Sequence, residues 1–183
     1  MKKRMFILIG LGVVALVVAA VAVAGTVTAT ATVTGAGALS LSNGATASIS
    51  DTLDGTDQSV NYTLPLTMND LRGSGAGWNL TMTSTTFNDG AGHSLATSAS
   101  SLAAATSACT AGGTCTNPTN AITYPLTVPA AATAPAAVKV FNAAANTGMG
   151  RFTVTPSINV SIPGNSYAGA YTSTLTIAAV SGP

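Results

Sequence analysis

Apolar and polar residues alternate with a period of two along most of the chain, which is the pattern of half-buried β-strands. Helical periodicity is nearly absent beyond the first 24 residues. The apolar positions of the alternating runs are Val27, Ala29, Ala31 and Val33; Tyr62, Leu64, Leu66 and Met68; Trp78, Leu80 and Met82; Val138 and Val140; Phe152 and Val154; Ile158, Val160 and Ile162; and Tyr171, Leu175 and Ile177.

Turn-forming residues separate these runs, for example Asp54-Gly55, Asn88-Asp89-Gly90 and Pro163-Gly164-Asn165. About eight or nine short strands with such turns predict an all-β fold, an antiparallel β-sandwich of the immunoglobulin-like or Greek-key type. Residues 90–120 are small and polar, so we expect a long excursion across one end of the sandwich, with a short helix near residues 100–105. Residues 130–137 form a second predicted loop.

The chain begins with an export signal. Lys2, Lys3 and Arg4 precede an apolar run from residue 5 to residue 24, and Ala22-Val23-Ala24 fits a cleavage site. The run is also about as long as a membrane span, ~20 residues, so a retained anchor or the hydrophobic helix of a pilin-like subunit is the alternative. We therefore expect a signal peptide over residues 1–24, an N-terminal strand or linker over 25–37 and one domain over 38–183.

The exported part carries few charges. Three basic residues, Arg72, Lys139 and Arg151, and five aspartates remain after the signal, a net charge of −2. This composition lacks a basic patch and excludes a nucleic-acid partner, and it allows a membrane partner only if the N-terminal segment is retained. The Thr, Ser and Asn side chains must supply the hydrated surface, as in many extracellular β proteins. We expect a secreted protein on the cell surface.

Cys109 and Cys115 are the only cysteines. Because export places them in an oxidising compartment, we expect a local disulfide that closes a glycine-rich loop. The sole histidine, His93, is not near either cysteine in sequence, and no C-x-x-C motif is present, so a metal or redox site is disfavoured.

Other candidate chemistry is weak. Asp51, Asp54 and Asp57 offer oxygen ligands for Ca²⁺, but their spacing is not that of an EF-hand, and a solvated turn explains them better. The sequence lacks G-x-S-x-G and H-E-x-x-H motifs, and His93 has no evident nucleophile nearby in sequence. We predict neither enzymatic activity nor a cofactor. The C-terminus shows no sorting motif, which disfavours covalent anchoring.

Two motifs resemble those of the WxL domain. Arg72-Gly73 precedes Gly77-Trp78-Asn79-Leu80, and Tyr171-Thr172-Ser173-Thr174-Leu175-Thr176 lies near the end of the chain. The resemblance extends from about Ala38 to Val180. It implies a module of Gram-positive surface proteins that binds the cell wall non-covalently. Ile177 stands where a second tryptophan is usual: if that tryptophan contacts the wall, wall binding is weakened here, and if it fills the core, Ile177 can replace it.

Trp78 has two interpretations. The alternating strand face favours a core position beside Leu80 and Met82. Alternatively, an exposed platform contacts the wall, with aromatic faces stacked on sugar rings and an arginine paired with carboxylates or phosphates. The platform residues would be Trp78, Leu80, Arg72, Tyr171 and Leu175.

Two functional hypotheses follow. The first is a secreted WxL-like module that associates non-covalently with a cell-wall polymer or with partner surface proteins. The second is a structural subunit of an extracellular filament or surface layer, in which the Thr26–Thr34 strand is donated to a neighbour's sheet edge. Pairing of that strand within its own domain is the simpler alternative.

Overall fold

The computed structural model describes residues 28–43 and 46–183. The chain divides between Val33 and Thr34, and a β domain occupies Thr34–Pro183. The predicted signal segment, residues 1–24, lies outside the described residues. The strand predicted over Thr26–Thr34 is not formed in its described part, since residues 28–34 are exposed and belong to no strand. Alternation alone does not make a strand, because the ladder needs a partner.

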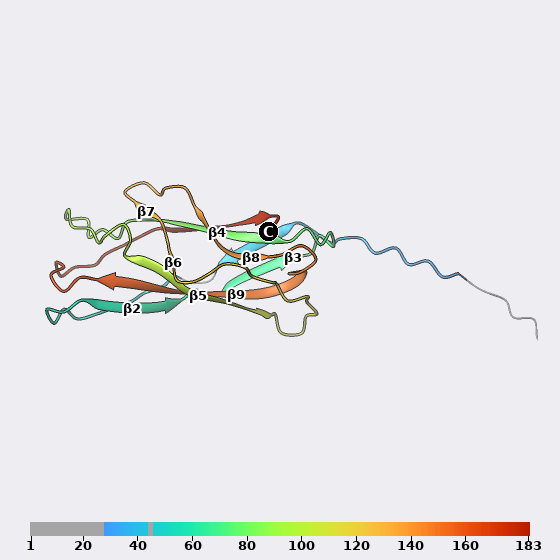
Figure 1. Ribbon diagram of the computed structural model, residues 1–183, viewed down its shortest axis with the longest axis horizontal. Coiled ribbons are helices and arrows are strands. Elements are labelled where there is room, and N and C mark those ends of the chain that lie inside the picture. The colour runs from blue at the N-terminus through green and yellow to red at the C-terminus, as the bar shows by residue number, and fades with distance from the viewer. Residues whose placement is uncertain (1–27, 44–45) are drawn as a thin grey trace, which may run out of the picture. The chain divides into compact units, whose positions relative to one another are not determined.

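Ten strands of the described residues form two sheets (Figure 1). The first sheet has the order β1 (Leu39–Asn43), β3 (Leu66–Asp70), β9 (Gly150–Ile162), β5 (Ser100–Cys109) and β6 (Leu126–Thr127), and β2 (Gln58–Thr63) also pairs with β9. The second sheet has the order β10 (Leu175–Ser181), β4 (Trp78–Thr85) and β7 (Ala130–Ala131), and β8 (Val138–Ala143) also pairs with β4. All pairs are antiparallel except β4–β7.

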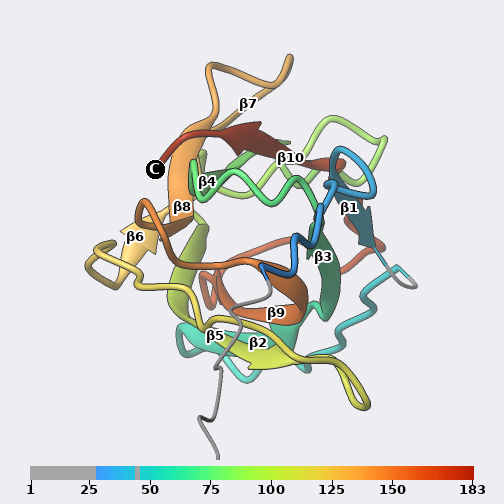
Figure 2. The same ribbon diagram turned by 90° about the vertical axis from the view of Figure 1, so that its right-hand side faces the viewer.

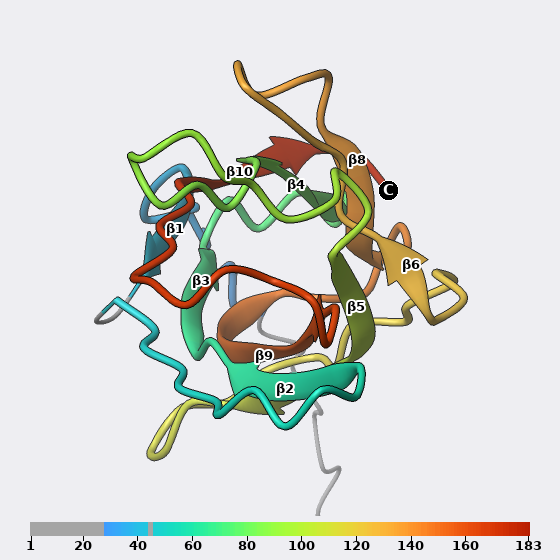
Figure 3. The same cartoon turned by 90° about the vertical axis from the view of Figure 1, so that its left-hand side faces the viewer.

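The two sheets pack face to face, as the end-on views in Figure 2 and Figure 3 show. The first sheet curves around the interior, so that β1 approaches β10 on one side and β5 approaches β8 on the other. The predicted all-β sandwich is thus confirmed. No helix in the described part of the chain is long and apolar enough to cross a membrane.

Strand β9 is the centre of the first sheet. It pairs with β2 and β3 on one side and with β5 on the other. The sequence predicted two apolar faces separated at Pro156, but the structure has one strand of 13 residues. Pro156 lies opposite the break between β2 and β3, where its carbonyl accepts a 3.0 Å hydrogen bond from Leu64 N. Proline is tolerated in a strand where no ladder N–H is needed.

Strand β5 corrects the prediction for residues 90–120. The short helix expected near residues 100–105 does not form, and Ser100–Cys109 is a strand that pairs with β9 along most of its length. Only Leu102 supplies a large buried side chain, and most of the later residues of β5 are exposed small ones. The backbone ladder to β9, rather than an apolar face, therefore fixes this strand.

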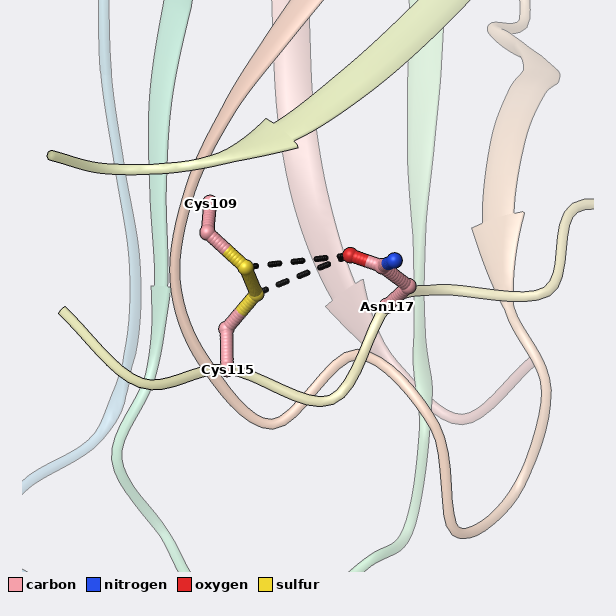
Figure 4. Close-up of a disulfide and its surroundings, with 3 residues drawn as sticks. All are labelled: Cys109, Cys115 and Asn117. Carbon is pink, nitrogen blue, oxygen red and sulfur yellow. Dashed lines mark hydrogen bonds between the residues drawn. A yellow bond between two sulfur atoms is a disulfide. The ribbon is translucent and has the colours of Figure 1, made fainter.

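The expected disulfide is present between Cys109, at the end of β5, and Cys115 (Figure 4). Asn117 Oδ1 lies 3.7 Å from both sulfur atoms. The loop that the disulfide closes is glycine-rich, as the sequence predicted. Directly after this loop, Thr116 pairs with Met149 in an isolated antiparallel bridge. The bridge holds a surface turn to the start of β9.

Candidate functional site

Trp78 lies in the core. Its side chain is fully buried, its Nε1 donates a 2.8 Å hydrogen bond to the Gly148 carbonyl, and its ring stacks on Phe141 at 5.7 Å between centroids. A Cβ on Gly148 would lie 2.7 Å from Trp78 Nε1, so this position requires glycine. Leu80 is also fully buried. The exposed-platform interpretation is therefore wrong for Trp78 and Leu80, because the β4 face that carries them points into the sandwich.

Arg72 is committed to internal contacts. Its guanidinium binds the buried Asp70 carboxylate through two hydrogen bonds of 2.8 and 2.9 Å, and it also donates to the Gly77 carbonyl and to Ser181 Oγ. The hydrogen bonds from Arg72 hold the pKa of Asp70 below its ordinary value. Arg72 therefore joins β3, the glycine-rich loop and β10, and is not free to pair with a wall anion.

Tyr171 and Leu175 lie at the opposite end of the domain. Strand β10 runs antiparallel to β4, with Ser181 opposite Trp78 and Leu175 opposite Ser84. Six residues at about 3.4 Å each separate the two ends by about 20 Å. The structure thus brings together Tyr171 and Leu175 from the predicted site, and separates them from the other three residues.

A groove of about 830 Å³ opens beside Tyr171, between the start of β10, the segment 46–49 and the inner faces of β1 and β2. The residues that line the groove combine half-buried apolar and aromatic side chains with many hydroxyl groups. Among the described residues that line it, none is charged. The members are Leu41, Thr46, Ala47, Ser48, Ile49, Tyr62, Leu64, Ser84, Phe87, Ser100 and residues 171–177.

Ser84 lines the groove and carries a hydroxyl without a protein partner in the described part of the chain. The residue is buried, and no hydrogen-bond partner is found for its Oγ among the described residues. It lies on the inward face of β4, two residues after Met82. A buried hydroxyl without a partner costs free energy unless water or a ligand satisfies it. The Oγ atom itself is enclosed by protein, so Ser84 borders the groove without presenting its hydroxyl to a molecule there.

A second, smaller hollow of about 280 Å³ also has Tyr171 in its lining. It is formed by the segment His93–Ala96, the turn after β9 and Tyr171 itself, so Tyr171 lines both depressions. Tyr167 stands at its rim with 64% of its surface exposed. The Tyr171 hydroxyl donates a 3.1 Å hydrogen bond to the Tyr167 carbonyl, which fixes the turn.

His93 and Tyr167 form an aromatic stack. Their ring centroids are 3.8 Å apart and their planes differ by 17°. His93 Nδ1 lies 2.5 Å from Asp89 Oδ2, and Asp89 Oδ1 accepts from the backbone N–H groups of Ala91 and His93. These hydrogen bonds, that from the His93 side chain above all, lower the pKa of Asp89 to about 2. The carboxylate therefore stays ionised and orients the imidazole.

The three candidate calcium ligands form a hydrogen-bonded turn instead. Asp54 Oδ1 accepts from Thr56 and Gln58, and Asp57 Oδ1 accepts from Gly164 N. Within residues 28–43 and 46–183, no three acidic, histidine or cysteine side chains gather closely enough to hold a metal ion. The hydrogen bonds of Asp54 and Asp57 are those of a turn, the interpretation that the sequence favours over calcium binding.

Sequence reasoning missed Tyr167 and assigned no binding role to His93. Both belong to turns, where no apolar alternation marks them, and their contact joins segments more than 70 residues apart. The one available signal was an aromatic residue in the polar turn Pro163–Tyr167.

The model of the family described as WxL domain, surface cell wall-binding, matches residues 23–181. The chain belongs to the WxL domain family. No curated protein and no solved structure matches it significantly. As a WxL protein it acts at the cell surface, where this domain binds the wall. The first WxL motif supplies the core through Trp78, whereas the second supplies Tyr171 and Leu175 to the groove.

Ile177 shows what replaces the second tryptophan of the WxL motif. It is half-buried, packs against the core and also lines the groove. Ile177 therefore occupies the core position that was expected if the second tryptophan serves packing.

Proposed function

We propose that this WxL module holds non-covalently to a polymer of the cell wall through the groove beside Tyr171. The observation that carries the proposal is the lining of the groove, which mixes apolar and hydroxyl-bearing side chains and includes no charged one. Such a lining suits an amphipathic, uncharged stretch of polymer, because apolar faces pack on Leu175 and Ile177 while hydroxyl groups exchange hydrogen bonds.

Co-sedimentation with purified cell-wall sacculi tests the proposal. Tyr171→Ala removes the aromatic side chain that lines both depressions. Ala47→Trp fills the groove from an exposed position that does not enter the core. Both variants should bind sacculi more weakly than the wild type. Val180→Ala removes exposed apolar surface at the other end of β10 and should bind normally. Normal binding by both groove variants, with folding intact, would refute the groove as the contact.

A second candidate function is a filament or surface-layer subunit that donates residues 26–34 to a neighbour. Two observations favour it: residues 28–33 are exposed and unpaired in the described structure, with Val33 94% exposed, and β4 is the only strand that pairs with β10 there. An unpaired edge is a template for another chain. The approach of β1 to β10 counts against it, since a donated strand needs that space.

Deletion of residues 25–34 separates the two candidates. A filament subunit should lose polymerisation and still fold as a monomer, whereas a wall-binding module should keep its affinity for sacculi. Electron microscopy of the protein released from its cell surface provides the first readout, since regular filaments or lattices would favour the subunit. Association with a partner surface protein would appear instead as a stable complex in the released material.

A further inference from the structure

The Tyr167–His93 stack has the features of a ligand platform. One face of the phenol ring lies against the imidazole at 3.8 Å, yet 64% of the Tyr167 surface remains exposed. We propose that the free face of Tyr167 binds one sugar ring of an uncharged wall glycan, with the rest of the glycan passing over Tyr171 toward the groove. The proposal rests on the proposed wall binding and adds the ligand class and the residues that recognise it.

Hydrogen bonds and the ring stack hold the parts of the platform in place. Asp89 fixes the imidazole through Nδ1, and the backbone of His93 bonds to Asp89 in both directions, through Asp89 N to His93 O and His93 N to Asp89 Oδ1. The Tyr171 hydroxyl holds the backbone of Tyr167. Because the ring is already ordered, binding costs little side-chain entropy.

The chemistry around the ring suits a sugar. An aromatic face carries partial negative charge and attracts the weakly positive C–H groups on one face of a pyranose ring. Asn165, Ser166 and Ser94 surround the hollow and can exchange hydrogen bonds with hydroxyl or N-acetyl groups at the ring edge. At about 280 Å³ the hollow lies near the lower limit of ligand pockets, about 300 Å³, and so fits a single sugar unit.

The distribution of charge argues for an uncharged ligand. The described basic side chains lie toward the other end of the domain: Arg72 contacts Ser181, Lys139 contacts the Pro183 carbonyl, and Arg151 lies at the start of β9 opposite Asn69. Among the residues that line the hollow, His93 is the one whose side chain can carry a positive charge, and its Nδ1 lies against the Asp89 carboxylate. An anionic polymer would therefore find no fixed positive charge near Tyr167.

Titration of the protein with a soluble tetramer of N-acetylglucosamine, followed by calorimetry, tests the platform. The wild type should bind, Tyr167→Ala should bind about tenfold more weakly or worse, and Tyr167→Phe, which keeps the ring, should stay within about threefold of the wild type. Val180→Ala is the matched control and should be unchanged. Tyr167 is exposed, so none of these substitutions threatens the fold, which circular dichroism verifies.

The outcomes of this titration and of the sacculus assay are separate. Sacculus binding by the wild type together with no tetramer binding, or with equal tetramer binding by Tyr167→Ala, overturns the sugar platform and leaves the proposed wall attachment standing. Binding of a poly(glycerol phosphate) probe in place of the tetramer also overturns it. Failure of the wild type to bind sacculi refutes the proposed function, whereas Tyr167-dependent tetramer binding still supports the platform.

Discussion

Replacement of Arg72 by alanine should destabilise the domain by about 3 kcal/mol at pH 7. Asp70 is 2% exposed and depends on Arg72 for both side-chain hydrogen bonds that its carboxylate accepts. Removal of one partner of a buried ion pair costs about 3–5 kcal/mol, and we take the lower value because the Arg72 side chain is 17% exposed. The variant also loses the contacts to Gly77 and Ser181. For a domain of this size the melting temperature should fall by roughly 6–12 °C.

The pH dependence of this loss gives the sharper test. In the wild type the Asp70 pKa is lowered, so its contribution to stability is present above the ordinary value near pH 4 and is lost as the pH falls through the lowered one. In Arg72→Ala the backbone N–H of residue 72 still donates to the carboxylate, but the guanidinium is gone, so burial should raise the Asp70 pKa relative to the wild type. Protonation then relieves the unpaired charge, and the deficit of the variant should shrink between about pH 5 and pH 3.

Urea unfolding followed by circular dichroism at pH 7 and pH 3 measures both effects. The double variant Asp70→Asn with Arg72→Ala is the control, because it removes the buried charge and should recover part of the stability at pH 7. A loss below about 1 kcal/mol, or an equal loss at both pH values, would refute the assignment of Arg72 as the partner that stabilises a buried carboxylate.

Three further perturbations probe the fold. Gly148→Ala should cost about 2–4 kcal/mol in urea unfolding, since φ is +68° and the new Cβ would lie 2.4 Å from Ala143 Cβ; a neutral result would contradict this packing. Trp78→Ala should cost about 3–5 kcal/mol in thermal melts monitored by circular dichroism, whereas an unchanged melt would mean that the indole is not in the core. Joint replacement of Cys109 and Cys115 by serine should cost about 2 kcal/mol in the same melts, and no loss would show that the bridge does not constrain the unfolded chain.

The parts of the fold that the sequence predicts are those with large apolar residues on one face. Strand β4 was evident from the alternating positions of Trp78, Leu80 and Met82, and strand β9 from those of Phe152 and Val154. Strand β5 was not, because its small residues leave no apolar face and only the ladder to β9 defines it. Local sequence predicts a strand that forms because its apolar side chains become buried. It does not predict a strand that forms because its backbone pairs with a neighbouring strand.

The candidate site divides in the same way. Tyr171 was identified from its motif, and the structure places it in the lining of both depressions. Arg72 was predicted to face a ligand, but it pairs with Asp70, two residues away in sequence. The motif alone does not show that this internal partner binds the guanidinium. The contact of Tyr167 with His93 forms between two turns that come together at the end of β9. No local sequence pattern predicts such a long-range contact.

Arg72 also marks the end of the domain at which the chain both enters and leaves. Ala36 N donates to the Leu71 carbonyl just before β1, and Gly182 N donates to the Gly77 carbonyl just after β10. Tyr171 and the groove lie about 20 Å away along β10. A fluorescent protein, an affinity tag or a surface-immobilisation peptide fused at either boundary would therefore project away from the groove, so residues 34–183 can be displayed from both ends without covering it.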